Sequence, residues 1–162
     1  GLNFIKRKMK TPEIFSEFNF SKFSDEEVSE NTKLEYIKQM ISLGNEDKKA
    51  VYPYFILSIG SIYFATDILL NDKLDTTFIE YIIYISGALL LVVSALLFFW
   101  YWRHIHVCVI KMTNCIPKLQ AHKCQTLWEK LWNDNGILFK LGLILIFTGC
   151  AFIYLFIILA FI

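Results

Sequence analysis

Three long apolar runs dominate the pattern of hydrophobic and polar positions along this chain. Residues 51–66, 81–102 and 141–162 contain no Asp, Glu, Lys or Arg, and the second and third runs are each 22 residues long. Because a helix rises about 1.5 Å per residue, about 20 apolar residues cross a bilayer core of roughly 30 Å. The first run reaches that length when it is extended through residues 67–70. The pattern therefore predicts three membrane-spanning helices.

The composition agrees with a membrane protein. Hydrophobic residues make up 56% of the chain, whereas soluble domains are about 45–50% apolar. We expect an all-α integral membrane protein with three transmembrane helices, an N-terminal cytosolic helical segment and an interfacial helix before the third span. The expected parts are an N-terminal segment (1–49), a transmembrane hairpin (50–103, with spans 51–70 and 79–102), a cytosolic loop carrying the interfacial helix (104–135), and the third span (136–162).

The positive charges are segregated along the chain, which predicts its orientation. Nine of the 16 Lys and Arg lie in residues 1–50, one lies between the first and second runs, five lie in residues 103–135, and Lys140 opens the third span. Lys and Arg close to the spans mark the inner side of a membrane. We therefore expect an inside N-terminus and an outside C-terminus, in a bacterial inner membrane or a mitochondrial inner membrane. No apolar run precedes residue 51, so we expect no signal peptide in these residues.

The first fifty residues carry two helix-start signals. Thr11-Pro12-Glu13 predicts a short helix at 12–18. The capping box that begins at Ser24 predicts a second helix from residue 25 to about residue 43, ended by Gly44-Asn45. One narrow face of this second helix is apolar and needs a partner surface: the membrane, the 103–135 loop, another copy of the chain or a different subunit. The residues predicted to dock are Leu34, Ile37, Met40 and Ile41.

Small residues recur at heptad spacing in the second and third spans. They are Gly87, Ser94, Gly142 and Gly149. Small side chains let helix backbones approach closely, which holds helices together in lipid, so we expect helix contacts here, within or between chains.

The segment between the second and third spans predicts a helix of its own. Pro117 is expected to open this helix, which runs to about Trp132 and is ended by residues 133–136. Its apolar face predicts that it lies in the membrane plane.

Six of the seven His and Cys residues fall in this same segment. On a continuous helix four of them would share one face: His104, Cys108, Cys115 and His122. Imidazole and thiolate are ligands that zinc, copper and iron prefer. Because Pro117 interrupts the helix and no C-x-x-C pair occurs, we favour a structural role over a metal or haem site. Acylation of Cys108 is a further alternative. We expect no cofactor, although a bound lipid is compatible with the pattern.

Two acids, Asp67 and Glu80, lie near the outer ends of the first two spans. In an oligomer they would form an acidic ring that favours cations at a pore mouth.

The motif content bounds the function. No phosphate-binding glycine loop, nucleophile elbow or H-E-x-x-H motif occurs, and acids interrupt the basic residues, so we expect neither an enzyme nor a nucleic-acid-binding protein. We expect a non-catalytic integral membrane subunit or regulator that assembles through its transmembrane helices and N-terminal helix. Its expected partners are the lipid bilayer and other membrane subunits or copies of itself. The alternatives are a homo-oligomeric channel or membrane-perturbing effector gated by its cytosolic segment, and a metal- or haem-binding membrane protein.

Overall fold

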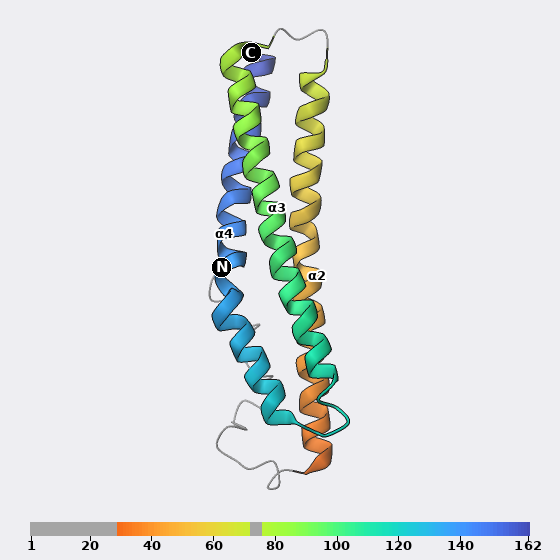
Figure 1. Ribbon diagram of the computed structural model, residues 1–162. Helices are drawn as coiled ribbons and strands as arrows, with labels where there is room; N and C mark the ends of the chain where they lie inside the picture. Colours follow the sequence, from red (N-terminus) through yellow and green to blue (C-terminus); the bar gives the residue numbers. More distant parts are fainter. Residues whose placement is uncertain (1–28, 72–75) are drawn as a thin grey trace. The chain divides into compact units, whose positions relative to one another are not determined.

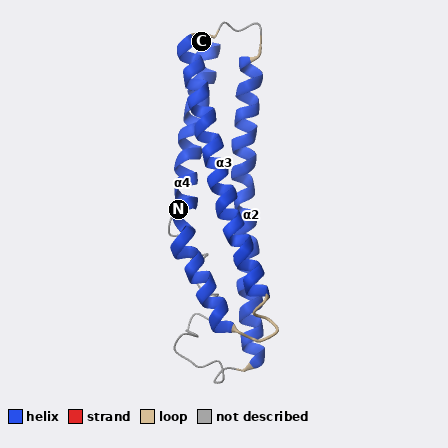
Figure 2. Cartoon of the chain, in the orientation of Figure 1, coloured by secondary structure: helices blue, strands red, loops and turns tan. Residues whose placement is uncertain are grey.

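The computed structural model describes residues 29–71 and 76–162, and all regular structure in these ranges is helical (Figure 1, Figure 2). Three long helices follow one another: α2 (Glu30–Leu69), α3 (Phe78–Thr113) and α4 (Ala121–Phe161). At about 1.5 Å per residue, their 40, 36 and 41 residues give lengths of about 54–62 Å. Each helix contains a stretch long and apolar enough to cross a membrane. Each is also nearly twice as long as a bilayer core is thick, about 30 Å.

Local capping and turn chemistry set where the helices begin. The Ser29 Oγ accepts a hydrogen bond from the Thr32 N–H at 3.3 Å and caps α2. At the start of α3, the Glu80 N–H donates to the Thr77 Oγ1 at 3.3 Å, and the Thr77 N–H donates to the Glu80 Oε2 at 3.2 Å. This reciprocal pair is a capping box. Before α4, Leu119 takes a left-handed φ of 52°, which separates the preceding turn from the helix.

The expected helix end at Gly44-Asn45 is wrong. Helix α2 runs through both residues without a break and continues past Pro53, which lies in its interior. Gly and Asn are only weak breaking signals, and packing against neighbouring helices overrides them. The predicted helix at 12–18 and the Ser24 capping box lie outside the described residues.

The expected boundaries before the third apolar run are also wrong. Pro117 lies in the turn between α3 and α4, not at a helix start. Helix α4 begins at Ala121 and continues through residues 133–136, so no separate interfacial helix precedes the third run. Two Asn and one Gly in that stretch reduce helix propensity, but the flanking residues pack well enough to keep the helix intact.

The chain divides into two compact units, and each helix contributes to both. Of the described residues, unit 1 comprises 29–50 and 102–136, and unit 2 comprises 51–71, 76–101 and 137–162. Unit 2 contains almost all of the three charge-free runs, whereas unit 1 contains most of the charged residues.

The core of unit 1 is closed by large side chains from all three helices. Six of them are at most 2% exposed: Tyr36, Ile37 and Met40 from α2, Ile105 and Met112 from α3, and Trp128 from α4. Gly44 lies in α2 at a point of close approach. A Cβ added there would be 2.6 Å from the Val109 Cγ2 and 3.5 Å from the Trp128 Cζ3. Gly44 therefore allows close packing of α2 against α3 and α4, whereas the sequence pattern had indicated that Gly44 ends the helix.

The core of unit 2 follows a heptad pattern. In α2, Val51, Ser58 and Ala65 are buried at steps of seven, and Ile68 is buried three residues further on. In α3 and α4, buried positions recur at alternating steps of three and four. They are Gly87, Leu91, Ser94, Phe98 and Tyr101, then Phe139, Gly142, Ile146, Gly149, Ile153 and Phe156. This spacing is typical of helices packed as in a coiled coil.

Candidate functional site

The four small residues predicted for helix packing lie at the α3–α4 contact of unit 2. A Cβ added to Gly87 or Gly149 would approach side-chain carbons of the facing helix to 3.0 or 2.9 Å. The Ser94 Oγ donates a buried hydrogen bond to the Gly142 carbonyl oxygen at 2.8 Å. The structure thus brings all four residues together within one chain, where they allow α3 and α4 to approach closely.

Helix α2 joins unit 2 through contacts that the sequence analysis missed. The Thr66 Oγ1 and the Tyr84 hydroxyl are hydrogen-bonded at 2.6 Å. The rings of Tyr54 and Phe98 stack 5.0 Å apart, and Phe139 meets Tyr54 edge-on at 5.9 Å. A signal was present in the sequence, because Val51, Ser58 and Ala65 repeat with the same heptad spacing as the small residues of the other spans.

The apolar stripe predicted to dock on a partner lies in unit 1. Ile37 and Met40 are fully buried within the chain, and Leu34 and Ile41 are half-buried. The chain's own fold therefore covers the centre of this stripe. Docking of a further partner on its two half-buried residues stays a prediction.

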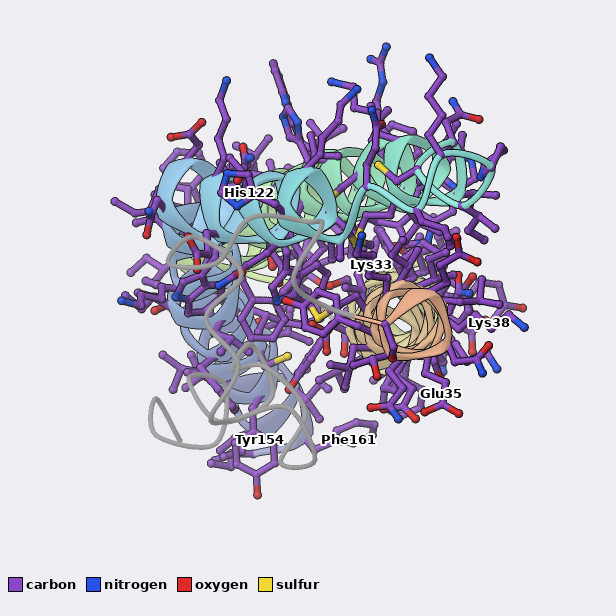
Figure 3. All side chains as sticks on the ribbon, turned by 90° about the horizontal axis from the view of Figure 1, so that it is seen from below. Lys33, Glu35, Lys38, His122, Tyr154 and Phe161 are labelled. Atoms are coloured by element: carbon purple, nitrogen blue, oxygen red, sulfur yellow. The ribbon has the colours of Figure 1, made fainter. Side chains whose placement is uncertain are left out.

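The predicted His and Cys ligands are not gathered at one point. Cys108 and Cys115 are buried, His104 is half-buried, and His122 is exposed near the start of α4 (Figure 3). Within residues 29–71 and 76–162, no three His, Cys, Asp or Glu side chains lie close enough to hold a metal ion. The Cys108 Sγ donates to the Leu127 carbonyl oxygen at 3.7 Å, so its thiol points toward α4, and acylation of Cys108 stays a prediction.

The three cysteines of unit 1 are held in their neutral form. Burial raises the pKa of the Cys108 thiol from 9.0 to about 11 and that of Cys124 to about 12. Burial also raises the pKa of Cys115, an effect that the nearby positive charge of Lys123 opposes. Because the thiolate is both the nucleophile and the metal ligand, burial lowers the reactivity of these thiols relative to an exposed cysteine.

The two predicted pore-mouth acids differ in their surroundings. Asp67 is exposed on α2. Glu80 is half-buried, and its carboxylate accepts the Thr77 N–H in the capping box that starts α3. Helix capping accounts for Glu80, whereas a pore-mouth role for either acid stays a prediction.

A cluster of three side chains in unit 1 was not foreseen from the sequence. The Lys48 Nζ lies 3.2 Å from the His106 Nδ1 and 6.0 Å from the centre of the Trp102 ring system. The Trp102 and His106 rings stack 5.1 Å apart with an angle of 4° between their planes. All three side chains are half-buried. The only sequence signal was their position beside the apolar runs.

The exposed face of α3 and α4 in unit 1 is basic. Residues 102–136 carry five exposed cations, Arg103, Lys111, Lys118, Lys123 and Lys130, against two acids, whereas residues 30–50 of α2 carry four of each. Figure 3 shows nitrogen-tipped side chains on the side of α3 and α4 that faces away from α2. Val107 and Ile110 are 41% and 49% exposed on this same part of α3.

Comparisons with protein-family models, with curated proteins and with solved structures found no match.

Proposed function

We propose that this protein is a non-catalytic integral membrane subunit or regulator, anchored in the bilayer by unit 2 and presenting unit 1 to a partner protein. The observation that carries this proposal is the exposed basic face of α3 and α4 in unit 1. This face belongs to unit 1, whose core side chains are already buried within the chain.

The surface of unit 2 supports insertion into a bilayer. Its helices bury small and weakly polar residues such as Ser58 and Ser94, which are fully buried, and turn large apolar side chains outward. Among the latter, Ile56, Tyr63, Leu89, Leu96, Ile144 and Phe147 are each at least 60% exposed. Monomeric soluble proteins rarely expose contiguous apolar patches beyond a few hundred Å², so lipid is the solvent that fits this surface.

The surface of unit 1 supports a partner outside the lipid. Most of its exposed positions on α3 and α4 are charged or polar, and two aliphatic side chains, Val107 and Ile110, are exposed between Arg103 and Lys111. A partner that presents acidic residues around a small apolar spot would complement this face. Opposite charges would speed encounter and fix orientation, and the apolar spot would add affinity.

The charge distribution also favours one orientation. The cations of unit 1 flank the apolar runs, and the positive-inside rule assigns such regions to the inner side. Unit 1 would then face the cytoplasm of a bacterium or the matrix of a mitochondrion.

The test is the composition of the protein purified from its own membranes. Extraction in a mild detergent followed by native mass spectrometry should give a fixed stoichiometry with at least one other chain. Changing Lys111, Lys118 and Lys123 together to Gln should release that chain. The control changes Lys38 and Lys49, both exposed on α2, to Gln, which removes positive charge from unit 1 but leaves α3 and α4 unchanged. A wild-type protein that purifies only as a monomer would contradict the proposal, and one that purifies only with itself would favour the channel alternative.

A further inference from the structure

The cluster of Lys48, Trp102 and His106 has a defined donor geometry. Lys48 has an ammonium group, which can only donate hydrogen bonds, so the His106 Nδ1 at 3.2 Å must accept. The neutral imidazole therefore carries its proton on Nε2, which remains a donor. Trp102 holds both groups, since it stacks on the imidazole at 5.1 Å and attracts the ammonium at 6.0 Å from its ring. The cluster thus presents N–H donors and one positive charge from a partly exposed position.

The sequence places this cluster at one depth in a membrane. Lys48 precedes the first charge-free run by three residues, and Trp102 is the last residue of the second run. At about 1.5 Å per residue, His106 lies about 6 Å beyond that run. The headgroup layer on each side of a bilayer core is about 5–8 Å thick. Each of the three residues would therefore lie at the level of the lipid headgroups.

We infer that Lys48, Trp102 and His106 form a binding site for the phosphate of an anionic phospholipid. This inference rests on the membrane insertion proposed above, not on the identity of any protein partner. A phosphodiester oxygen accepts from the Lys48 ammonium, which the His106 Nδ1 holds in place by accepting one of its three N–H donors at 3.2 Å. The Trp102 ring lies at the depth where indole side chains commonly meet headgroups. Arg103, exposed and next to Trp102, adds a second positive charge.

Phosphatidylglycerol is the probe for this site, and phosphatidylcholine is the zwitterionic comparison. The full chain is purified in detergent, stripped of lipid and titrated with each lipid, and bound lipid is counted by native mass spectrometry. Wild-type protein should bind phosphatidylglycerol in preference to phosphatidylcholine. Lys48→Gln should weaken phosphatidylglycerol binding about fivefold, as expected for one cation near an anionic surface. His106→Phe keeps an aromatic ring beside Trp102, removes the acceptor that orients the Lys48 ammonium, and should also weaken binding.

Lys38→Gln is the matched control, because it removes one exposed cation of unit 1 ten residues before Lys48. It should leave phosphatidylglycerol binding unchanged. Equal losses in Lys48→Gln and Lys38→Gln, or equal binding of both lipids by the wild type, would overturn the inference. Circular dichroism identifies any variant that fails to fold. If either Lys48→Gln or His106→Phe fails, the lipid binding of the other variant is compared with the wild type.

Two further arms separate the sources of failure. Inorganic phosphate added as a competitor should not displace phosphatidylglycerol, and displacement at millimolar concentration would reassign the site to a soluble anion. Extraction of the wild type from its membranes by alkaline carbonate would refute membrane insertion. The lipid titration is done in detergent, so it reports on the site whether or not the partner proposal holds.

Discussion

The α3–α4 contact of unit 2 can be tested by adding a side chain where the structure has no room. In Gly149→Leu, the new Cβ would lie 2.9 Å from the Leu91 Cγ and 3.2 Å from the Leu90 Cβ. The optimal van der Waals separation of two carbon atoms is about 3.5–4.0 Å, so the contact with the Leu91 Cγ is too short by about 0.6–1.1 Å. The Leu90 Cβ is bonded directly to the backbone and cannot rotate away. Relief therefore requires α3 and α4 to move apart.

The expected cost follows from this displacement. A gap of about 0.5–1 Å forfeits a quarter to a half of each dispersion contact along the interface. Overpacked cores lose about 1–3 kcal/mol of stability, and we expect Gly149→Leu to fall in that range. The matched control is Gly60→Leu in α2, because a Cβ there would meet no atom within 4 Å. Both variants gain the same helix propensity, about 0.8 kcal/mol, so the difference between them isolates the packing term.

The assay is equilibrium unfolding in mixed micelles of a mild detergent and sodium dodecyl sulfate, followed by tryptophan fluorescence. Gly149→Leu should unfold at a lower sodium dodecyl sulfate fraction than the wild type, and Gly60→Leu should unfold at the same or a higher fraction. Equal midpoints for the two variants would show that α3 and α4 do not meet at Gly149.

Three further predictions follow from unit 1 and from the charge pattern. Ile37→Ala should destabilise the protein by about 2–5 kcal/mol, because Ile37 is fully buried, whereas Ile110→Ala, at 49% exposed, should cost less than about 1 kcal/mol. Thermal unfolding compares the two. The pKa of Cys108 is raised from 9.0 to about 11 by folding, so as the pH rises the unfolded chain loses this proton before the folded chain does. The free energy of unfolding should therefore fall as the pH rises from 9.0 to about 11. The fall should be shallower in Cys108→Ala, and an unchanged slope would contradict the burial of this thiol. An impermeant maleimide applied to intact cells should label Asn71→Cys but not Lys38→Cys, and labelling of Lys38→Cys would refute the orientation.

The sequence predicts those features that depend on local composition. Each charge-free run is long enough to identify a helix regardless of its neighbours, and each lies within one of the three long helices. The small residues of the second and third spans could be identified for the same reason, because close packing requires small side chains at heptad spacing. What this spacing does not specify is which helix lies opposite. The Ser94 hydrogen bond to Gly142 joins residues 48 positions apart, which is a property of the fold alone.

The features that the sequence analysis missed depend on packing between distant segments. Gly44 followed by Asn45 has the composition of a helix end, but its missing side chain accommodates Val109 and Trp128 from two other helices. The same limit applies to the Lys48–His106 hydrogen bond, whose partners are 58 positions apart. No local pattern distinguishes a glycine that ends a helix from a glycine that packs against a side chain of another helix. Nor does a local pattern distinguish a hydrogen-bonded lysine from a solvated one.

Asp67 and Glu80, the two predicted pore-mouth acids, have equivalent positions in the sequence pattern but different surroundings in the structure. The Glu80 carboxylate accepts the Thr77 N–H at 3.2 Å, so the start of α3 accounts for its presence. The channel alternative then depends on Asp67, which is exposed. In a planar bilayer recording, Asp67→Asn should lower cation-over-anion selectivity if this chain forms a pore. Glu80→Gln, which keeps a side chain able to complete the capping box, should leave selectivity unchanged. Equal losses of selectivity in both variants would support a pore-mouth role for Glu80. A chain that conducts no ions, with or without its partners, would refute the channel alternative.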